Sequence, residues 1–205
     1  MIINMTTFAG RRTHYIHQTL ESLFESDGRD IPLNLIMGSR DTGHIERYRK
    51  VANIVLWDQA AQSQAREGNL RYNCNLNAIR ALNYGDDDHC LCCEDDITFN
   101  QQWFSQLMLT IAEIDRKEYV LNLGQRRDYS PDKRYVIFTR PDLTGAQAIF
   151  YPGKTVRYAV AEYARQNIKR ATIDNLIGEY AKQYAVLYST SPALIVHIGQ
   201  VSSFH

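Results

Sequence analysis

Apolar and polar positions follow two patterns along the chain, one typical of strands and one typical of helices. Short apolar runs predict strands at residues 2–8, 31–37, 51–57, 89–97, 119–123, 135–139, 147–150 and 193–198. Apolar residues that recur every three or four positions predict helices at 13–26, 64–84, 102–114, 156–166 and 173–183. The order of these elements favours an α/β fold, in which helices lie on both faces of a central sheet.

Length and charge narrow the class of protein. The 205 residues fit one domain, which we expect to span residues 1–205. The 23 basic and 23 acidic residues balance, so net charge does not call for nucleic acid or an anionic membrane as a partner. The amino end has no signal-peptide pattern, and no apolar window is long enough for a bilayer. We therefore expect a cytoplasmic protein.

The four cysteines are crowded into one region, with Cys90, Cys92 and Cys93 on a single predicted strand. This layout suits reduced core thiols better than disulfides. A zinc site at Cys90, Cys92 and Cys93 is less favoured, because no second ligand pair follows at the usual spacing.

The most informative segment is the strand at 89–97, which ends in Glu94, Asp95 and Asp96. Three adjacent carboxylates repel one another unless a metal or basic groups offset their charge. Side chains alternate along a strand, so Glu94 and Asp96 are expected to point one way and Asp95 the other. That pair suits a hard cation such as Mg²⁺ or Mn²⁺ with phosphate oxygens in its shell. The alternative is an acidic turn that caps the next helix.

The loops after the first, second and fourth strands are expected to face one crevice, because ligands of open α/β sheets lie beyond the carboxyl ends of the strands. The first loop carries Thr7, Phe8 and Arg11 near a helix N-terminus, where backbone N–H groups and a guanidinium can hold phosphate. It lacks the glycine pattern of a P-loop or dinucleotide fold. Arg71 and Asn75 stand one helical turn apart and could reach the same crevice, although exposed helices often carry such pairs.

Three motifs together resemble those of metal-dependent nucleotide-sugar glycosyltransferases of the GT-A fold. They are Thr6–Arg12 after the first strand, Glu94–Asp96 after the fourth, and the late His197-Ile-Gly. Within that class, Glu94–Ile97 and Val196–Ser203 look closest to the N-acetylglucosaminyltransferase IV type. The resemblance implies a GT-A type domain with a mixed, mostly parallel sheet. We expect no membrane anchor here, unlike those enzymes, which are also much longer.

The resemblance also implies roles for the acidic triplet and for His197. The triplet would act as the Asp-x-Asp motif, in which Asp96 binds Mn²⁺ or Mg²⁺ while Glu94, beside Asp95, addresses the nucleotide-sugar donor. His197, at the end of an apolar strand, would be a further metal ligand. A histidine there is equally often a satisfied core residue.

Two later positions are further candidates, Asp174 on the acceptor side and Gly145 among the donor-binding residues. Asp174 resembles the carboxylate that these enzymes place at the start of a late helix, where it would act as the base. The alternative is an acid that is favoured in a first helical turn by the helix dipole, behind a cap at Thr172. Glu179 and Asp142 are fallback bases. Gly145, in a loop of small residues before a strand, would let donor and acceptor approach the backbone, or would form an ordinary turn.

The expected activity is transfer of a hexosyl or N-acetylhexosaminyl group from a nucleotide sugar, with UDP favoured, to a hydroxyl of a glycan or similar acceptor with inversion. The alternatives are a nucleotidyltransferase of related topology and a catalytically silent nucleotide- or sugar-binding module. A basic and aromatic region at 126–140 could grip a sugar, a phosphate or single-stranded nucleic acid. A hydroxyl-bearing nucleic-acid base is therefore a further acceptor, less favoured than a glycan.

Overall fold

The computed structural model describes residues 1–8, 15–124, 130, 132–138, 143, 145 and 147–199. The strands are β1 Ile2–Thr7, β2 Leu33–Met37, β3 Asn53–Val55, β4 Cys90–Glu94, β5 Ile97–Phe99, β6 Val120–Asn122, β7 Tyr135–Ile137, β8 Ala148–Tyr151, β9 Leu187–Thr190 and β10 Ile195–His197. The helices are α1 Ile16–Phe24, α2 Gln59–Gln64, α3 Leu70–Asn83, α4 Trp103–Glu113, α5 Lys154–Asn167 and α6 Ile173–Tyr184, with a short 3₁₀ helix at Glu46–Tyr48.

The central sheet has the strand order β3-β2-β1-β4-β8-β6-β9-β7. Strands β3, β2, β1 and β4 run parallel to one another, whereas β8 is antiparallel to both β4 and β6. A separate pair, β10 and β5, is antiparallel. The fold is therefore a mixed α/β fold with a mostly parallel sheet, as the sequence predicts.

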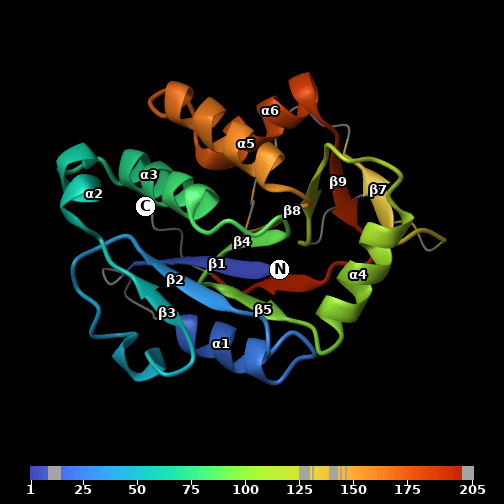
Figure 1. Ribbon diagram of the computed structural model, residues 1–205, viewed down its shortest axis with the longest axis horizontal. Helices are drawn as coiled ribbons and strands as arrows, with labels where there is room; N and C mark the ends of the chain where they lie inside the picture. Colours follow the sequence, from blue (N-terminus) through green and yellow to red (C-terminus); the bar gives the residue numbers. More distant parts are fainter. Residues whose placement is uncertain are drawn as a thin grey trace.

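Helices cover the two faces of this sheet (Figure 1). Helices α3, α5 and α6 lie on one face, and α1 lies on the other, beside β5. The apolar stripe of α1 explains its orientation, because Ile16, Leu20 and Leu23 are all buried while the charged residues face solvent. Arg80 fastens α3 to the sheet by donating to the carbonyl oxygens of Met37 at 2.6 Å and Leu56 at 2.5 Å.

Some predicted elements differ from those of the structure. The helix predicted at 64–84 begins only at Leu70, as α3, and the separate helix α2, which ends at Gln64, was not predicted. Gly68 adopts φ +70°, and the Asn69 side chain accepts from the N–H of Tyr72 at 2.9 Å, which caps α3. The strand predicted at 89–97 ends at Glu94 and resumes as β5 at Ile97. Strand β9 was not predicted at all.

The four cysteine thiols are free, with Cys90 and Cys93 buried. Burial raises the pKa of Cys93 well above that of an ordinary thiol. Sulfur atoms of Cys90 and Cys92 lie 3.7 Å apart on one face of β4.

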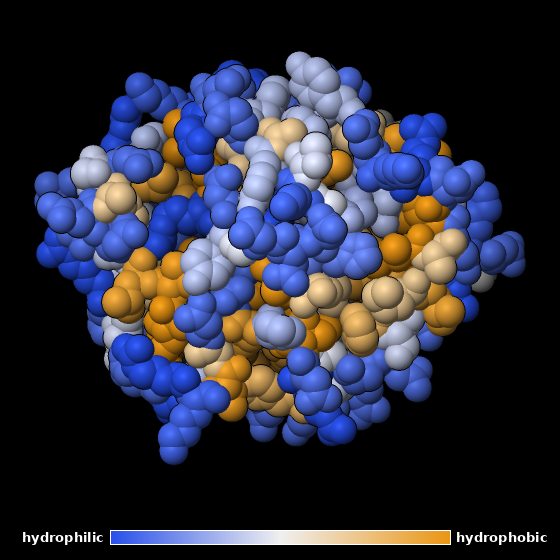
Figure 2. Space-filling model, in the orientation of Figure 1, coloured by the Kyte–Doolittle hydropathy of each residue, from blue (hydrophilic) through white to orange (hydrophobic). Residues whose placement is uncertain are grey.

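The surface in Figure 2 is mostly polar, with apolar side chains exposed over α4 at the right of the view. The large apolar residues exposed on α4 are Met108 and Leu109. Across the described parts of the chain, no helix combines the length and apolar character needed to span a bilayer.

Candidate functional site

The carboxyl ends of β2, β1 and β4 meet at one edge of the sheet. Met37 pairs with Thr7, and Thr6 pairs with Glu94 in the parallel register. The N–H of Gly38 donates to the carbonyl of Thr7 at 2.9 Å. A Cβ atom at Gly38 would overlap the Phe8 ring, so only glycine lets that ring lie against this backbone. The described parts of these loops therefore share the edge predicted from the sequence.

Asp95 is buried and held by groups from β1 and α1. Thr7 Oγ1 donates to its carboxylate at 2.5 Å, and Thr19 Oγ1 donates to its backbone carbonyl at 2.9 Å. Because the Thr7 hydroxyl has one proton, His44 Nε2, 3.1 Å away, is the donor in its contact with Thr7. These bonds turn the chain out of β4 after Glu94, so the predicted strand alternation does not extend to Asp96. They also give Asp95 and Thr7 a role in holding the acidic segment to β1 and α1.

Asp96 and His197 are brought together by the pairing of β5 with β10. Ile97 pairs with His197, and Asp96 Oδ2 lies 3.3 Å from His197 Nε2. The N–H of Ile198 donates to the Asp96 carbonyl at 2.9 Å, which fixes the two segments side by side. The Asp96 side chain is 8% exposed and that of His197 is 41% exposed, so the pair reaches solvent from the histidine side.

The pair has the chemistry of a half-site for a divalent cation. Carboxylate oxygen and imidazole nitrogen are both ligands for Mn²⁺, and adjacent ligands of one such ion lie about 3 Å apart. A Cβ atom at Gly199 would overlap both Asp96 Oδ2 and His197 Nε2, so glycine keeps the space around this pair open. Within the described residues no group of three or more potential protein ligands occurs, so water or phosphate oxygens would complete the shell.

Glu94 lies at a cleft between the sheet and helices α3 and α6. The cleft encloses about 400 Å³, including space open to solvent. Its lining residues are Thr6, Ala78, Ala81, Leu82, Cys92, Cys93, Glu94, Ile149, Tyr151, Ile173 and Ile177. The hydroxyl of Tyr151 is buried without a hydrogen-bond partner among the described residues, and burial raises its pKa.

Asp174 and Gly145 are in direct contact. The N–H of Gly145 donates to Asp174 Oδ2 at 2.7 Å, with Gly145 at φ +80°. One helical turn further along α6, a Cβ atom at Gly178 would lie 2.9 Å from Cβ of Leu143, so the glycine admits the buried Leu143. The described residues of the loop between β7 and β8 are therefore docked on the face of α6 that carries Asp174. The structure thus joins Asp174, expected on the acceptor side, to Gly145, expected among the donor-binding residues.

Asn75 contacts the turn between α5 and α6. Its side chain is 1% exposed, donates to the carbonyls of Ile168 and Ala171, and accepts from the N–H of Ile173. Both of its N–H protons are thereby used by backbone groups of the α5–α6 turn. Arg71, one turn away, is exposed and its guanidinium lies 3.4 Å from the carbonyl of Lys169. Both side chains contact that turn, and Ile173, whose N–H is held by Asn75, lines the cleft together with Thr6 and Glu94.

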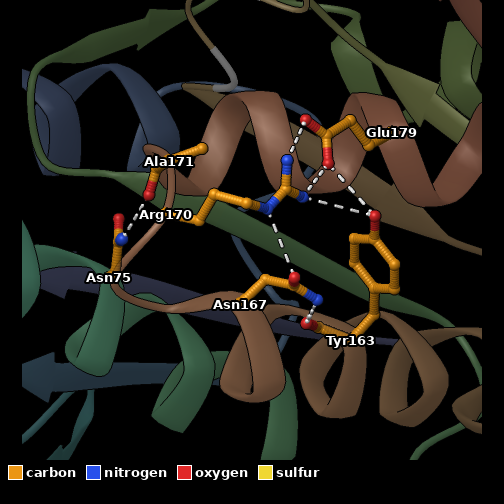
Figure 3. A network of polar contacts seen from close by, with 6 residues as sticks. All are labelled: Asn75, Tyr163, Asn167, Arg170, Ala171 and Glu179. Carbon is orange, nitrogen blue, oxygen red and sulfur yellow. Dashed lines mark hydrogen bonds and ion pairs between the residues drawn. The ribbon is translucent and has the colours of Figure 1, made fainter.

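Glu179 belongs to an ion-paired network (Figure 3). Arg170 donates to both carboxylate oxygens of Glu179, and the Tyr163 hydroxyl donates to one of them at 3.1 Å. The hydrogen bonds from Arg170 lower the pKa of Glu179. A carboxylate held in its charged form by a cation is a weak proton acceptor, which favours Asp174 over Glu179 as a base.

Other residues of interest lie outside the described part of the chain: Arg11, Asp142, the segment 126–129, Arg140 and residues 200–203. Sequence reasoning did not select His44, Tyr151 or Gly199. Gly199 could have been found from its spacing in His197-Ile-Gly, whereas nothing near His44 or Tyr151 indicates their contacts with distant strands.

No protein-family model and no curated protein sequence matches this chain. Solved structures do match, and three of them are of the glycosyltransferase TarS from S. aureus. A structure of TarS matches with TM-score 0.55 and 14% identity, and one of TarS residues 1–349 with TM-score 0.57 and 16% identity. TarS residues 1–349 in complex with UDP match with TM-score 0.60 and 17% identity.

These matches cover 96% of this chain and 36% to 60% of the TarS chains. At such identity they show a shared fold. The α/β architecture of this chain is therefore similar to that of a glycosyltransferase, and the chain spans at most about three fifths of the TarS chains that it matches.

Proposed function

We propose that this protein is a metal-dependent glycosyltransferase that moves a sugar from a UDP-sugar to an acceptor hydroxyl with inversion. One observation carries the proposal: β5 and β10 hold Asp96 Oδ2 at 3.3 Å from His197 Nε2, at the end of the strand whose Glu94 lines a cleft. The glycosyltransferase fold supports it, since a structure with that fold contains UDP.

On the donor side, Asp96 and His197 would hold Mn²⁺ or Mg²⁺. The cation supplies positive charge against the negative charge that builds on the departing nucleoside diphosphate. Glu94 would accept hydrogen bonds from the donor at the mouth of the cleft. Thr7, Phe8 and Asp95 support this edge through the contacts described above, and we retain Arg11 as a candidate phosphate ligand.

On the acceptor side, Asp174 would act as the base. As the sugar leaves the diphosphate, the acceptor hydroxyl forms the new bond to the anomeric carbon and its proton passes to a carboxylate oxygen of Asp174. The N–H of Gly145 holds Oδ2 of this carboxylate, which fixes its orientation. The apolar residues of the cleft exclude water from the neighbouring donor side.

We further propose a hexosyl or N-acetylhexosaminyl donor, following the resemblance to the N-acetylglucosaminyltransferase IV type, a glycan acceptor and a cytoplasmic location. No contact among the described residues favours a nucleotidyltransferase over a glycosyltransferase. None favours a nucleic-acid acceptor over a glycan.

Thermal unfolding in the presence of UDP-, GDP- and TDP-sugars, each with and without Mn²⁺, tests the proposal. A ligand at one hundred times its Kd stabilises the folded state by about 2.7 kcal/mol, which raises Tm by roughly 5–10 °C for a chain of this size. We expect this rise for UDP-sugars with Mn²⁺ only. Stabilisation by nucleoside triphosphates instead would favour a nucleotidyltransferase.

Asp174→Asn separates turnover from binding. We expect the variant to keep the Mn²⁺-dependent rise in Tm with UDP-sugars and to lose at least about a hundredfold in transfer, as is usual when a general base is removed. Tritium- or ¹³C-labelled sugar donors measure the transfer. A wild-type protein that binds UDP-sugar and transfers to no glycan would indicate the silent binding module, and full transfer by Asp174→Asn would contradict the base assignment.

A further inference from the structure

Helix α6 begins without a cap of its own. Its first N–H groups have no partner within the helix, as at every helix N-terminus, and Thr172 at the N-cap position makes no side-chain cap hydrogen bond. The cap predicted at Thr172 from the sequence is therefore wrong. The helix that carries Asp174 must be fixed by something else.

Asn75 of α3 supplies that cap from nearly one hundred residues away. Its Oδ1 accepts from the N–H of Ile173 at 2.9 Å, the residue just before Asp174. Its Nδ2 donates to the carbonyl of Ala171 at 2.8 Å and to that of Ile168 at 3.0 Å. One buried amide thus satisfies three backbone groups of the α5–α6 turn, and Figure 3 shows it at the side of Ala171.

The same turn is fixed from its other side by Arg170. Arg170 donates to Glu179 of α6, and its Nε lies 3.3 Å from Oδ1 of Asn167, the last residue of α5. Arg170 is half exposed, whereas Asn75 is buried, so the Asn75 contacts are the ones shielded from competing water. The position of the first turn of α6 along its axis is consequently set by Asn75.

We propose that Asn75 is a positioning residue for Asp174 and, through it, for the loop that carries Gly145. The chain of contacts is short: Asn75 holds the N–H of Ile173, the next residue is Asp174, and Asp174 holds the N–H of Gly145. Asn75 also belongs to α3, whose residues Ala78, Ala81 and Leu82 line the cleft beside Glu94. It therefore ties the proposed base to the wall of the donor side. The effect of Asn75 on sugar transfer rests on the proposed function, whereas its effect on the position of Asp174 rests on the contacts alone.

Asn75→Ala and a matched control, Asn167→Ala, test the inference in the full-length chain. Asn167 lies in the same turn and also loses side-chain hydrogen bonds, from its Nδ2 to the Tyr163 carbonyl at 2.9 Å and from Arg170 Nε to its Oδ1 at 3.3 Å, but it contacts no N–H of α6. We expect Asn75→Ala to lower kcat for sugar transfer at least about tenfold while the Kd for UDP with Mn²⁺ stays within about twofold. Asn167→Ala should keep both values.

Hydrogen–deuterium exchange gives a readout that does not require activity. In Asn75→Ala the amides of Ile173 and Gly145 should exchange at least about tenfold faster, with no such change in Asn167→Ala. Asn75→Asp retains an acceptor for the N–H of Ile173 but brings a carboxylate oxygen against the carbonyls of Ile168 and Ala171, so it should not restore kcat. If Asn75→Ala does not fold, Asn75→Ser replaces it in the same comparison with Asn167→Ala. Its hydroxyl is a shorter acceptor than the asparagine amide.

Three results would overturn the inference. One is unchanged exchange at Ile173 and Gly145 in Asn75→Ala. The second is faster exchange there with kcat unchanged, which would leave Asn75 a purely structural role. The third is a loss of UDP affinity of tenfold or more, which would make Asn75 a donor ligand. If the wild type neither binds nor transfers a UDP-sugar, the proposed function fails, and the exchange comparison still decides whether Asn75 positions Asp174.

Discussion

At the scale of single residues, the acidic segment is held by hydroxyl groups. Thr7 donates to the buried carboxylate of Asp95, and Thr19 donates to its backbone. A hydrogen bond to a charged acceptor in a buried site contributes more than one at the surface, because the acceptor has no water to replace a lost donor.

Thr7→Val removes the hydroxyl and keeps the shape of the side chain. We expect it to lower the free energy of unfolding by about 1–3 kcal/mol, the cost of leaving a buried acceptor short of a donor. Urea unfolding at pH 7 measures it. Thr6→Val is the control, since its hydroxyl makes a 3.3 Å bond to the Cys93 carbonyl and is partly buried. Equal losses in the two variants would contradict a special role for Thr7.

Glu179 gives a prediction with a defined pH dependence. Its pKa is lowered because Arg170 donates to its carboxylate, so the pair stabilises the folded state above the ordinary glutamate pKa. This contribution is lost as pH falls through the lowered pKa. Because both side chains are partly exposed, we expect Glu179→Gln to cost less than about 1 kcal/mol at pH 7 and to cost less at pH 3, below the ordinary glutamate pKa, than at pH 7. Urea unfolding at both pH values checks this, and a difference that grows on acidification would refute it.

Sequence reasoning could identify residues whose chemistry is local. The triplet Glu94–Asp96 was selected from its residue types and neighbours, and His197 from the resemblance to GT-A glycosyltransferases. The structure places Asp96 against His197. Asn75 was selected as a donor ligand from its spacing to Arg71. Its partners lie 93 to 98 residues away, and a local pattern carries no information about contacts at that separation.

At the scale of elements, α6 and the loop before β8 act together. Asp174 holds the N–H of Gly145, and Gly178 makes room for Leu143. Asp174 and Gly178 are one helical turn apart on the same face of α6, so α6 contacts the loop at two points. Any change that displaces the loop is therefore expected to disturb the proposed base as well.

Gly178→Ala tests this coupling. Overpacking against Leu143 costs about 1–3 kcal/mol, which exceeds the gain of about 1 kcal/mol from the higher helix propensity of alanine. We expect a lower Tm and slower sugar transfer. Gly153→Ala is the control, because a Cβ atom there meets nothing within 4 Å. A Gly178→Ala variant that is as stable and as active as the wild type would contradict the coupling.

Periodicity predicted the elements that bury a continuous apolar face, such as β1, α1 and α4. It missed β9, whose buried Ser189 and Thr190 give no apolar signal and are stabilised by hydrogen bonds to the carbonyls of Gly124 and Leu123. It also missed α2 and began α3 too early, at residue 64, because the polar residues between the two helices fit a solvent-exposed helix as well as they fit a loop. Gly68-Asn69 is the signal that marks this break.

At the scale of the whole molecule, the proposed site is assembled from different parts of the fold. The parallel half, β3-β2-β1-β4, brings together the strand ends proposed for the donor. Elements beyond β4 bring the remaining groups: β10 contributes His197, and α6 contributes Asp174. The pairing of β5 with β10 explains why Asp96 and His197, which are 101 positions apart, form one pair.

Calorimetric titration of UDP, with and without Mn²⁺, into the wild type, Asp96→Asn and His197→Ala tests the central claim most directly. We expect Mn²⁺ to tighten UDP binding to the wild type at least about tenfold, a coupling free energy of about 1.4 kcal/mol or more. Each substitution is expected to remove this tightening. Binding of UDP by the wild type that is the same with and without Mn²⁺, or a Mn²⁺ effect that survives in Asp96→Asn, would contradict it.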